Sequence, residues 1–296
     1  MISQHRFSIG PTGAEIAMLQ WGERGKPPAL LLHGTGFVAD VWEEVARDLA
    51  STFTVYALDR RGHGASHKPG SYHFLDYAED VCRVIDALDL RDVYGIGHSA
   101  GATDLLLAAK LRTGRFTRLF VMEPTVMDPR AARPGELNGE SLARVQGTLS
   151  RRAEFDSADA VLERYRAAPA FADWTETSLR AYVRHGFAPL ENGGVRLCCT
   201  PEIESAILRP IYEAMEQVYV GDARGNPFAL LAEIDCPVRV TTAAKSGPIY
   251  KEMASRAVSL IPRVSTLVFE SAGHCVAQEL PARVVDAVRE FATSGP

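Results

Sequence analysis

Long apolar runs, a secretory leader and an excess of positive charge are all missing from this chain of 296 residues. No run of about 18 or more apolar residues occurs, so we expect no membrane-spanning helix. Residues 1–10 lack the charged and then apolar pattern of a secretory signal, which favours a cytoplasmic protein. The formal net charge of −5 argues against nucleic acid, because phosphate binding needs a basic face. A small-molecule substrate is the expected partner, and a homodimer stays open.

Cysteine is scarce, and its spacing argues against two kinds of site. The 5 cysteines are odd in number and no pair has C-x-x-C spacing, so neither a disulfide framework nor a zinc site is expected. Cys275 stands beside a histidine, but a small apolar filler explains it better than a nucleophile does. The sequence therefore predicts no metal and no organic cofactor.

Short apolar runs alternate with amphipathic stretches along much of the chain, which is typical of a largely parallel sheet with crossover helices. The runs are continuously apolar, as strands covered on both faces need to be. They lie at residues 28–33, 53–58, 93–97, 119–122, 238–242 and 266–269. Segments 5–9 and 15–21 read as an antiparallel edge pair. The pattern predicts an α/β fold.

One region interrupts this alternation. From about residue 124 to residue 235 there is no convincing buried strand, whereas helical patterns occur at residues 158–167, 177–187 and 203–218. Turn-rich pieces such as E-N-G-G separate them. An inserted helical region of this length predicts a cap that lies over one edge of the sheet.

Residues 97–101 read G-H-S-A-G and fit the nucleophile-elbow pattern G-x-S-x-G. A serine on such a sharp strand-to-helix turn has a strained backbone, and the chain passes it only if the residues two before and two after are small. The predicted strand at 93–97 and the predicted helix at 100–111 supply the required context. That helix directs its positive N-terminus at Ser99, the candidate nucleophile.

Residues 33–36, H-G-T-G, follow the first buried strand directly. Glycines there allow backbone N–H groups to turn toward an oxyanion that forms beside the serine. One donor from Gly34 or Thr35, with the amide of Ala100, would make an oxyanion hole. The alternative is a plain glycine-rich turn.

A histidine in the segment S-A-G-H follows the last predicted strand, where open α/β sheets place their sites. This residue, His274, is the candidate general base. His33 and His63 occur in turn motifs and are expected to anchor loops. His98 lies within the elbow, where it is expected to line the substrate pocket.

These motifs, together with L-D-R-R-G-H-G-A-S at residues 58–66, resemble in order and spacing the α/β-hydrolase family with a helical cap. The resemblance implies an α/β-hydrolase fold, with a mostly parallel eight-stranded sheet, flanking helices and an inserted helical cap. It implies a core of residues 1–123 and 236–296 and a cap of residues 124–235. It also implies that Asp59 fixes a loop rather than taking part in catalysis.

The family's catalytic triad needs an acid beside the histidine. Most members place it after the strand at 238–242, where this chain reads A-A-K-S and offers no carboxylate. A minority, such as zearalenone lactonase-like hydrolases, place a glutamate at the end of the strand before the cap. Glu123 stands there, where an unpartnered carboxylate would be costly. Asp128 is the alternative acid. The structural alternative is that Glu123 caps the entry to the cap or pairs with an arginine such as Arg118.

A serine nucleophile predicts hydrolysis of a carboxylic ester or lactone through an acyl-serine intermediate. Another reaction on the same triad, such as C–C bond hydrolysis, amide cleavage or perhydrolysis, is the first alternative. A slow-turnover, receptor-like binding protein is the second. Possible lining residues of an apolar substrate pocket are Phe37, Trp42, Phe171, Trp174, Tyr212 and Met215.

Overall fold

An eight-stranded sheet runs through the computed structural model, which describes residues 4–70, 72–127, 143, 145–209 and 226–294. The strand order is β1-β2-β4-β3-β5-β6-β10-β11. β1 and β2 pair antiparallel, as do β2 and β4, and the remaining neighbours are parallel. The strands are β1 (Gln4–Ile9), β2 (Ile16–Trp21), β3 (Pro28–Leu32), β4 (Thr54–Leu58), β5 (Val93–His98), β6 (Phe116–Met122), β10 (Val238–Ala243) and β11 (Val264–Phe269). The predicted α/β-hydrolase sheet is confirmed.

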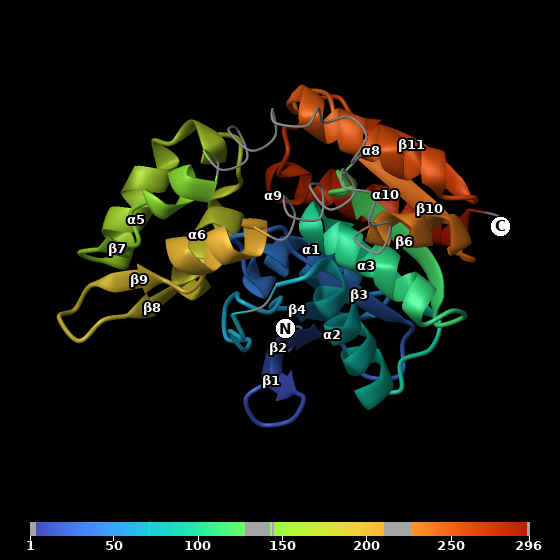
Figure 1. The fold of residues 1–296 in the computed structure, drawn as a ribbon, viewed down its shortest axis with the longest axis horizontal. Coiled ribbons are helices and arrows are strands. Elements are labelled where there is room, and N and C mark those ends of the chain that lie inside the picture. Colours follow the sequence, from blue (N-terminus) through green and yellow to red (C-terminus); the bar gives the residue numbers. More distant parts are fainter. Residues whose placement is uncertain (1–3, 71, 128–142, 144, 210–225, 295–296) are drawn as a thin grey trace.

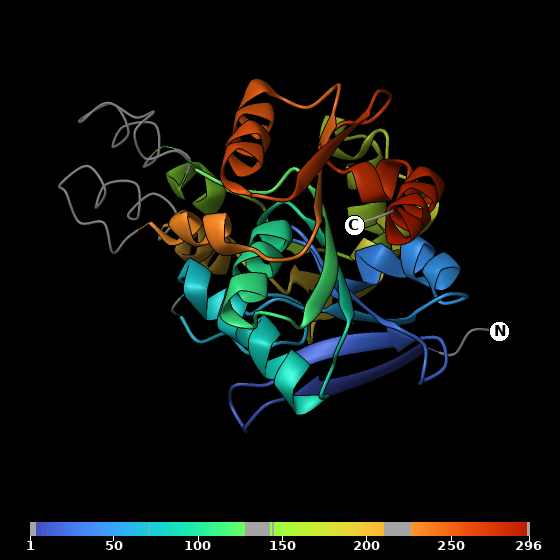
Figure 2. The ribbon, with the colours of Figure 1, turned by 90° about the vertical axis from the view of Figure 1, so that its right-hand side faces the viewer.

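Helices cover both faces of this sheet, as the continuously apolar strands require. α1 (Glu43–Leu49) and α10 (Pro281–Thr293) lie on one side, and α2 (Phe74–Ala87), α3 (Ala100–Leu111) and α8 (Pro248–Leu260) lie on the other (Figure 2). Leu31 packs with the first group, whereas Leu30 and Leu32 pack with the second. Because each fully buried leucine stabilises the fold by about 1.5–3 kcal/mol, both layers contribute to the core.

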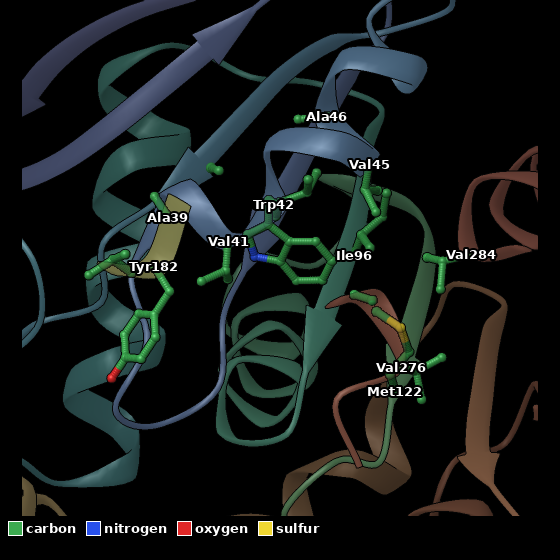
Figure 3. Close-up of a cluster of buried hydrophobic side chains, with 14 of the residues drawn as sticks. Ala39, Val41, Trp42, Val45, Ala46, Ile96, Met122, Tyr182, Val276 and Val284 are labelled. Carbon is green, nitrogen blue, oxygen red and sulfur yellow. The ribbon is translucent and has the colours of Figure 1, made fainter. Parts of the chain in front are cut away.

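Trp42 lies in the core and not in a substrate pocket. It ends the 3₁₀ helix η1 (Ala39–Trp42), is fully buried, and belongs to the same apolar cluster as Ile96, Val45 and Val276 (Figure 3). The prediction that Trp42 lines the pocket is therefore wrong. Its place directly before α1 buries the ring between that helix and the sheet.

The inserted region contains helices and also a small sheet, which the sequence did not predict. The three strands pair antiparallel in the order β7-β9-β8. They are only two or three residues long, too short to produce a recognisable hydrophobic period. The elements are β7 (Glu154–Phe155), α5 (Ala158–Arg166), η2 (Pro169–Phe171), α6 (Glu176–His185), β8 (Phe187–Pro189), β9 (Val195–Leu197) and η4 (Pro227–Glu233), and residues 201–209 are helical.

In Figure 1, α5, α6 and the small sheet form a group to one side of the main sheet and its helices. The boundaries 124 and 235 of the cap stay predictions. Asp128, Tyr212 and Met215 lie outside the described residues. Within the described part of the chain, no helix is both long and apolar enough to cross a membrane.

Candidate active site

Ser99 occupies the sharp turn between β5 and α3. Its backbone has φ 53° and ψ −123°, a conformation that costs free energy for any residue with a side chain and is concentrated at functional sites. A Cβ on Gly97 would collide with the backbone of Ala102, and one on Gly101 with the backbone of Leu32. The G-x-S-x-G pattern is thus a steric requirement of this turn. The side chain of Ser99 is partly exposed, while the residues on either side of it are buried.

Glu123 and His274 form a short hydrogen bond. The Nδ1 atom of His274 lies 2.6 Å from Oε2 of Glu123, and the glutamate is completely buried. Glu123 directly follows β6 with a φ of 47°, so it too has a strained backbone. Its N–H donates to the carbonyl of Thr241 on β10, which holds this conformation. The structure therefore brings together the predicted base and the predicted acid.

The carboxylate of Glu123 receives hydrogen bonds from three groups. Besides His274, the N–H of Ala243 donates to Oε1 at 2.9 Å and the hydroxyl of Ser246 donates to Oε2 at 2.8 Å. These donors offset much of the cost of burying a charge. Arg118 instead donates to the carbonyl of Ser294, so the alternative in which Arg118 pairs with Glu123 is wrong.

The position of β10 explains why the loop at residues 243–246 has no acid. In the sheet, β10 lies between β6, which precedes Glu123, and β11, which precedes the loop of His274. The glutamate side chain therefore reaches past the end of β10 to meet the imidazole. Small residues such as Ala243 leave room for it, and a second carboxylate there would repel the first.

His98, the last residue of β5, contacts the backbone of His274. Its Nε2 atom lies 2.8 Å from the carbonyl oxygen of His274, and the two rings are 4.7 Å apart. Because a carbonyl accepts, Nε2 of His98 carries the hydrogen and donates it. Burial lowers the pKa of His98 to about 3, so the ring is neutral at physiological pH. His98 is only 1% exposed, and its predicted place in the substrate pocket stays a prediction.

Two buried histidines hold the glycine-rich loop after β3. Nε2 of His33 accepts from the N–H of Arg60, and Nε2 of His63 accepts from the N–H of Gly36. The Nδ1 atoms of both rings lie within 2.9 Å of backbone carbonyls. This pattern defines neutral rings with the hydrogen on Nδ1, and burial lowers the pKa of His63 to about 3. The predicted anchoring roles of His33 and His63 agree with this geometry.

Asp59 ties the same region together. Its carboxylate accepts from the N–H of Ala39 at 2.7 Å and from that of Ala65 at 2.9 Å. The implied structural role of Asp59 fits these contacts.

Aromatic rings gather beside this loop. Phe37 is partly buried and lies 5.1 Å from Trp174 and 5.4 Å from Tyr182, between ring centroids. The hydroxyl of Tyr182 donates to the carbonyl of Gly36 at 2.9 Å, which fixes α6 of the inserted region to the loop. The cluster joins the glycine-rich loop after β3 to the inserted region. Whether Phe37 and Trp174 line a substrate pocket stays a prediction.

Two residues near His274 were not predicted from the sequence. Ser246 bonds to Glu123, and the ring of Tyr250 stacks on the ring of His274 at 3.8 Å with an interplanar angle of 19°. The signal for Ser246 was available, because a buried carboxylate needs donors and the neighbouring loop offers one hydroxyl. Tyr250 gave no signal, because its ring reaches the histidine only through the placement of α8.

Cys275 is not a rival nucleophile. Burial raises the pKa of its thiol to about 12, so the reactive thiolate is absent at physiological pH. Among the described residues, no group of three or more His, Cys, Asp or Glu side chains could hold a metal ion.

The sheet order, the elbow and the paired histidine and glutamate define the class of the protein. The model of the alpha/beta hydrolase family matches residues 29–287. The chain belongs to the alpha/beta hydrolase family.

Relatives within the family differ in their named activities. A non-heme chloroperoxidase of Streptomyces lividans is 34% identical over 149 residues, which is 48% of this chain and 54% of that protein. This chain thus spans about half the length of that relative. The 2-(acetamidomethylene)succinate hydrolase of Mesorhizobium japonicum is 27% identical over 271 residues, 91% of this chain and 89% of that protein.

A solved structure shows the same fold over the whole chain. The crystal structure of E-2-(acetamidomethylene)succinate hydrolase has a TM-score of 0.79 at 22% identity, with 99% of this chain and 100% of that chain covered. At this identity the similarity establishes the fold alone.

Proposed function

We propose that this protein is a serine hydrolase that cleaves a carboxylic ester or lactone of a small, largely apolar molecule. The observation that carries the proposal is the hydrogen bond of 2.6 Å between His274 and the buried Glu123, at the sheet edge where Ser99 occupies the elbow. His98, the residue before Ser99, contacts His274, with the two rings 4.7 Å apart, which supports placing the hydroxyl within reach of the oriented imidazole, as acyl transfer needs.

In this reaction Glu123 holds the hydrogen of His274 on Nδ1. The other ring nitrogen, Nε2, is then free to take the proton of the Ser99 hydroxyl as its oxygen attacks the substrate carbonyl. The same proton passes to the leaving alcohol, and the acyl group stays on the serine. Water, deprotonated by the same nitrogen, then releases the acid and restores the serine. Glu123 stabilises the imidazolium that forms in each step.

The backbone amides of Gly34 or Thr35 and of Ala100 would hold the oxyanion. The amide of Gly36 already donates to His63, and that of Phe37 donates to the carbonyl of Gly34. This leaves the first two amides of the loop as the candidates. Ala100 is the first residue of α3, where amides have no partner within the helix. Each such donor lowers the barrier by about 3 kcal/mol.

The partly buried ring of Phe37, with Trp174 against it, supports an apolar acyl or alcohol group in the substrate. The proposed reaction uses no metal or organic cofactor, and its partner is a small molecule. Its setting is the cytoplasm.

A fluorophosphonate probe tests the nucleophile directly. We expect the wild-type protein to be labelled at Ser99 and the Ser99→Ala variant to remain unlabelled. A panel of p-nitrophenyl esters of rising chain length, with lactones of several ring sizes, then finds the substrate class. A folded wild-type protein that the probe does not label would contradict the serine mechanism and favour a binding protein.

Amide hydrolysis is the second candidate. It is supported by the similarity over 91% of the chain to a hydrolase whose named substrate carries an acetamido group. Matched ester and amide substrates with the same acyl group separate the two. Faster turnover of the amide at equal concentration would favour this second candidate.

A further inference from the structure

The loop between β10 and α8, residues 243–247, contacts the glutamate of the pair. The hydroxyl of Ser246, whose residue is only 7% exposed, donates to Oε2 of Glu123 at 2.8 Å. His274 bonds to the same oxygen at 2.6 Å. Ala243 holds the other oxygen through its N–H at 2.9 Å. With both oxygens held, the carboxylate cannot rotate away from the imidazole without breaking a bond to this loop.

The first turn of α8 contacts the histidine of the pair. The ring of Tyr250 lies parallel to the imidazole of His274, 3.8 Å away between centroids. An aromatic face at this distance restricts rotation of the imidazole about its own side-chain bonds. It also attracts the positive charge that the ring acquires when it takes a proton.

The loop is also fixed to the segment that carries His274. The N–H of Ala244 donates to the carbonyl of Phe269 at 3.1 Å, and that of Lys245 donates to the carbonyl of Ala272 at 3.0 Å. These bonds join the β10–α8 loop to the end of β11 and the turn that follows it. The positions of Ser246 and His274 are therefore set by one connected piece of backbone, as groups that support a precise site need.

We propose that Ser246 and Tyr250 are positioning residues for the His274–Glu123 pair. The first holds the acid by its second hydrogen bond, and the second holds the base by its ring. This inference rests on the proposed function, because positioning matters only if His274 moves a proton. It assigns a task to the loop that lacks the acid.

Kinetics of three variants test the inference. Ser246→Ala removes one hydrogen bond to a charged group, and we expect kcat to fall about tenfold with KM within about twofold of the wild type. Tyr250→Leu removes the ring, and we expect kcat to fall about fivefold. Tyr250→Phe keeps the ring, and we expect it to retain at least about half of wild-type kcat. Ser255→Ala, at an exposed position of the same helix, is the matched control and should leave kcat unchanged.

A spectroscopic measurement needs no substrate. The proton on Nδ1 of His274, held in a short hydrogen bond, should give a strongly deshielded NMR resonance that Glu123→Gln abolishes. We expect Ser246→Ala to shift this resonance and Ser255→Ala to leave it in place. If the resonance shifts but no ester, lactone or amide is turned over, positioning stands and the proposed function fails.

The inference is overturned if Ser246→Ala folds, keeps wild-type kcat and leaves the resonance unchanged. It is equally overturned if Tyr250→Phe loses as much activity as Tyr250→Leu, because the ring would then not be the feature that matters. Urea unfolding verifies that each variant is folded, and if Tyr250→Leu does not fold, Ser246→Ala decides.

Discussion

Replacing Glu123 by glutamine tests the assignment of the acid with almost no change in side-chain shape. Three hydrogens point at this carboxylate, from His274, Ser246 and Ala243. An amide has one acceptor oxygen and two hydrogens of its own, so it cannot accept all three. With its oxygen on the N–H of Ala243, the amide nitrogen faces the histidine and donates to it.

The magnitude follows from the tautomer of the histidine. If Nδ1 of His274 accepts from the new amide, the hydrogen of the neutral ring moves to Nε2, which then cannot take the proton of Ser99. We expect kcat to fall by about two to four decades, equivalent to about 3–5 kcal/mol of added barrier. The fold loses only hydrogen bonds at one buried site, so the free energy of unfolding should fall by about 1–3 kcal/mol.

Steady-state kinetics on the best ester of the panel measure kcat and KM, and urea unfolding measures stability. Glu252→Gln, at an exposed position of α8, is the matched control and should behave as the wild type. The reasoning is refuted if Glu123→Gln stays within about threefold of wild-type kcat. If, at the same time, Asp128→Asn is inactive and folded, the acid is Asp128.

Three further predictions concern the frame of the site. Gly101→Ala should lower the free energy of unfolding by about 3 kcal/mol, because the new Cβ would meet the backbone of Leu32. Gly147→Ala, at a helical position with open space around it, should leave the stability unchanged or raise it slightly. Equal effects of the two substitutions in urea unfolding would contradict the steric argument. Asp104→Asn should lower the free energy of unfolding by about 3–5 kcal/mol, because it leaves the buried guanidinium of Arg60 without its anion. A loss below about 1 kcal/mol in the same assay would show that the fold does not need this ion pair. Burial lowers the pKa of His63 from the usual 6.5 to about 3 in the folded protein. The neutral ring therefore contributes its full stabilisation above pH 6.5, and this contribution is lost as the pH falls from 6.5 toward 3. Between pH 7 and pH 5 this loss amounts to about 2 kcal/mol. In His63→Gln, the difference in unfolding free energy between these two pH values should shrink by that amount. An unchanged difference would mean that the fold does not lower the pKa of His63.

Much of the core could be predicted because its signals are local. Strands buried on both faces read as continuous apolar runs. The turn of the elbow itself requires the glycine at position 97, because a Cβ there would meet the backbone of Ala102. The small sheet of the inserted region was not predicted, because strands such as Phe187–Pro189 are too short to show a hydrophobic period. Trp42 was misjudged for a related reason: an aromatic side chain reads the same in a core as in a pocket.

The sequence by itself determined the α/β fold, the elbow at Ser99 and the loop histidine His274, since each depends on residues adjacent in the chain. Only the tertiary structure decided how these groups are held. The strand order places β10 between the acid and the base, so Glu123 meets its donors more than a hundred residues away. Tyr250 reaches the imidazole only because α8 packs there. Such contacts depend on the packing of distant segments, which no local pattern of residues encodes.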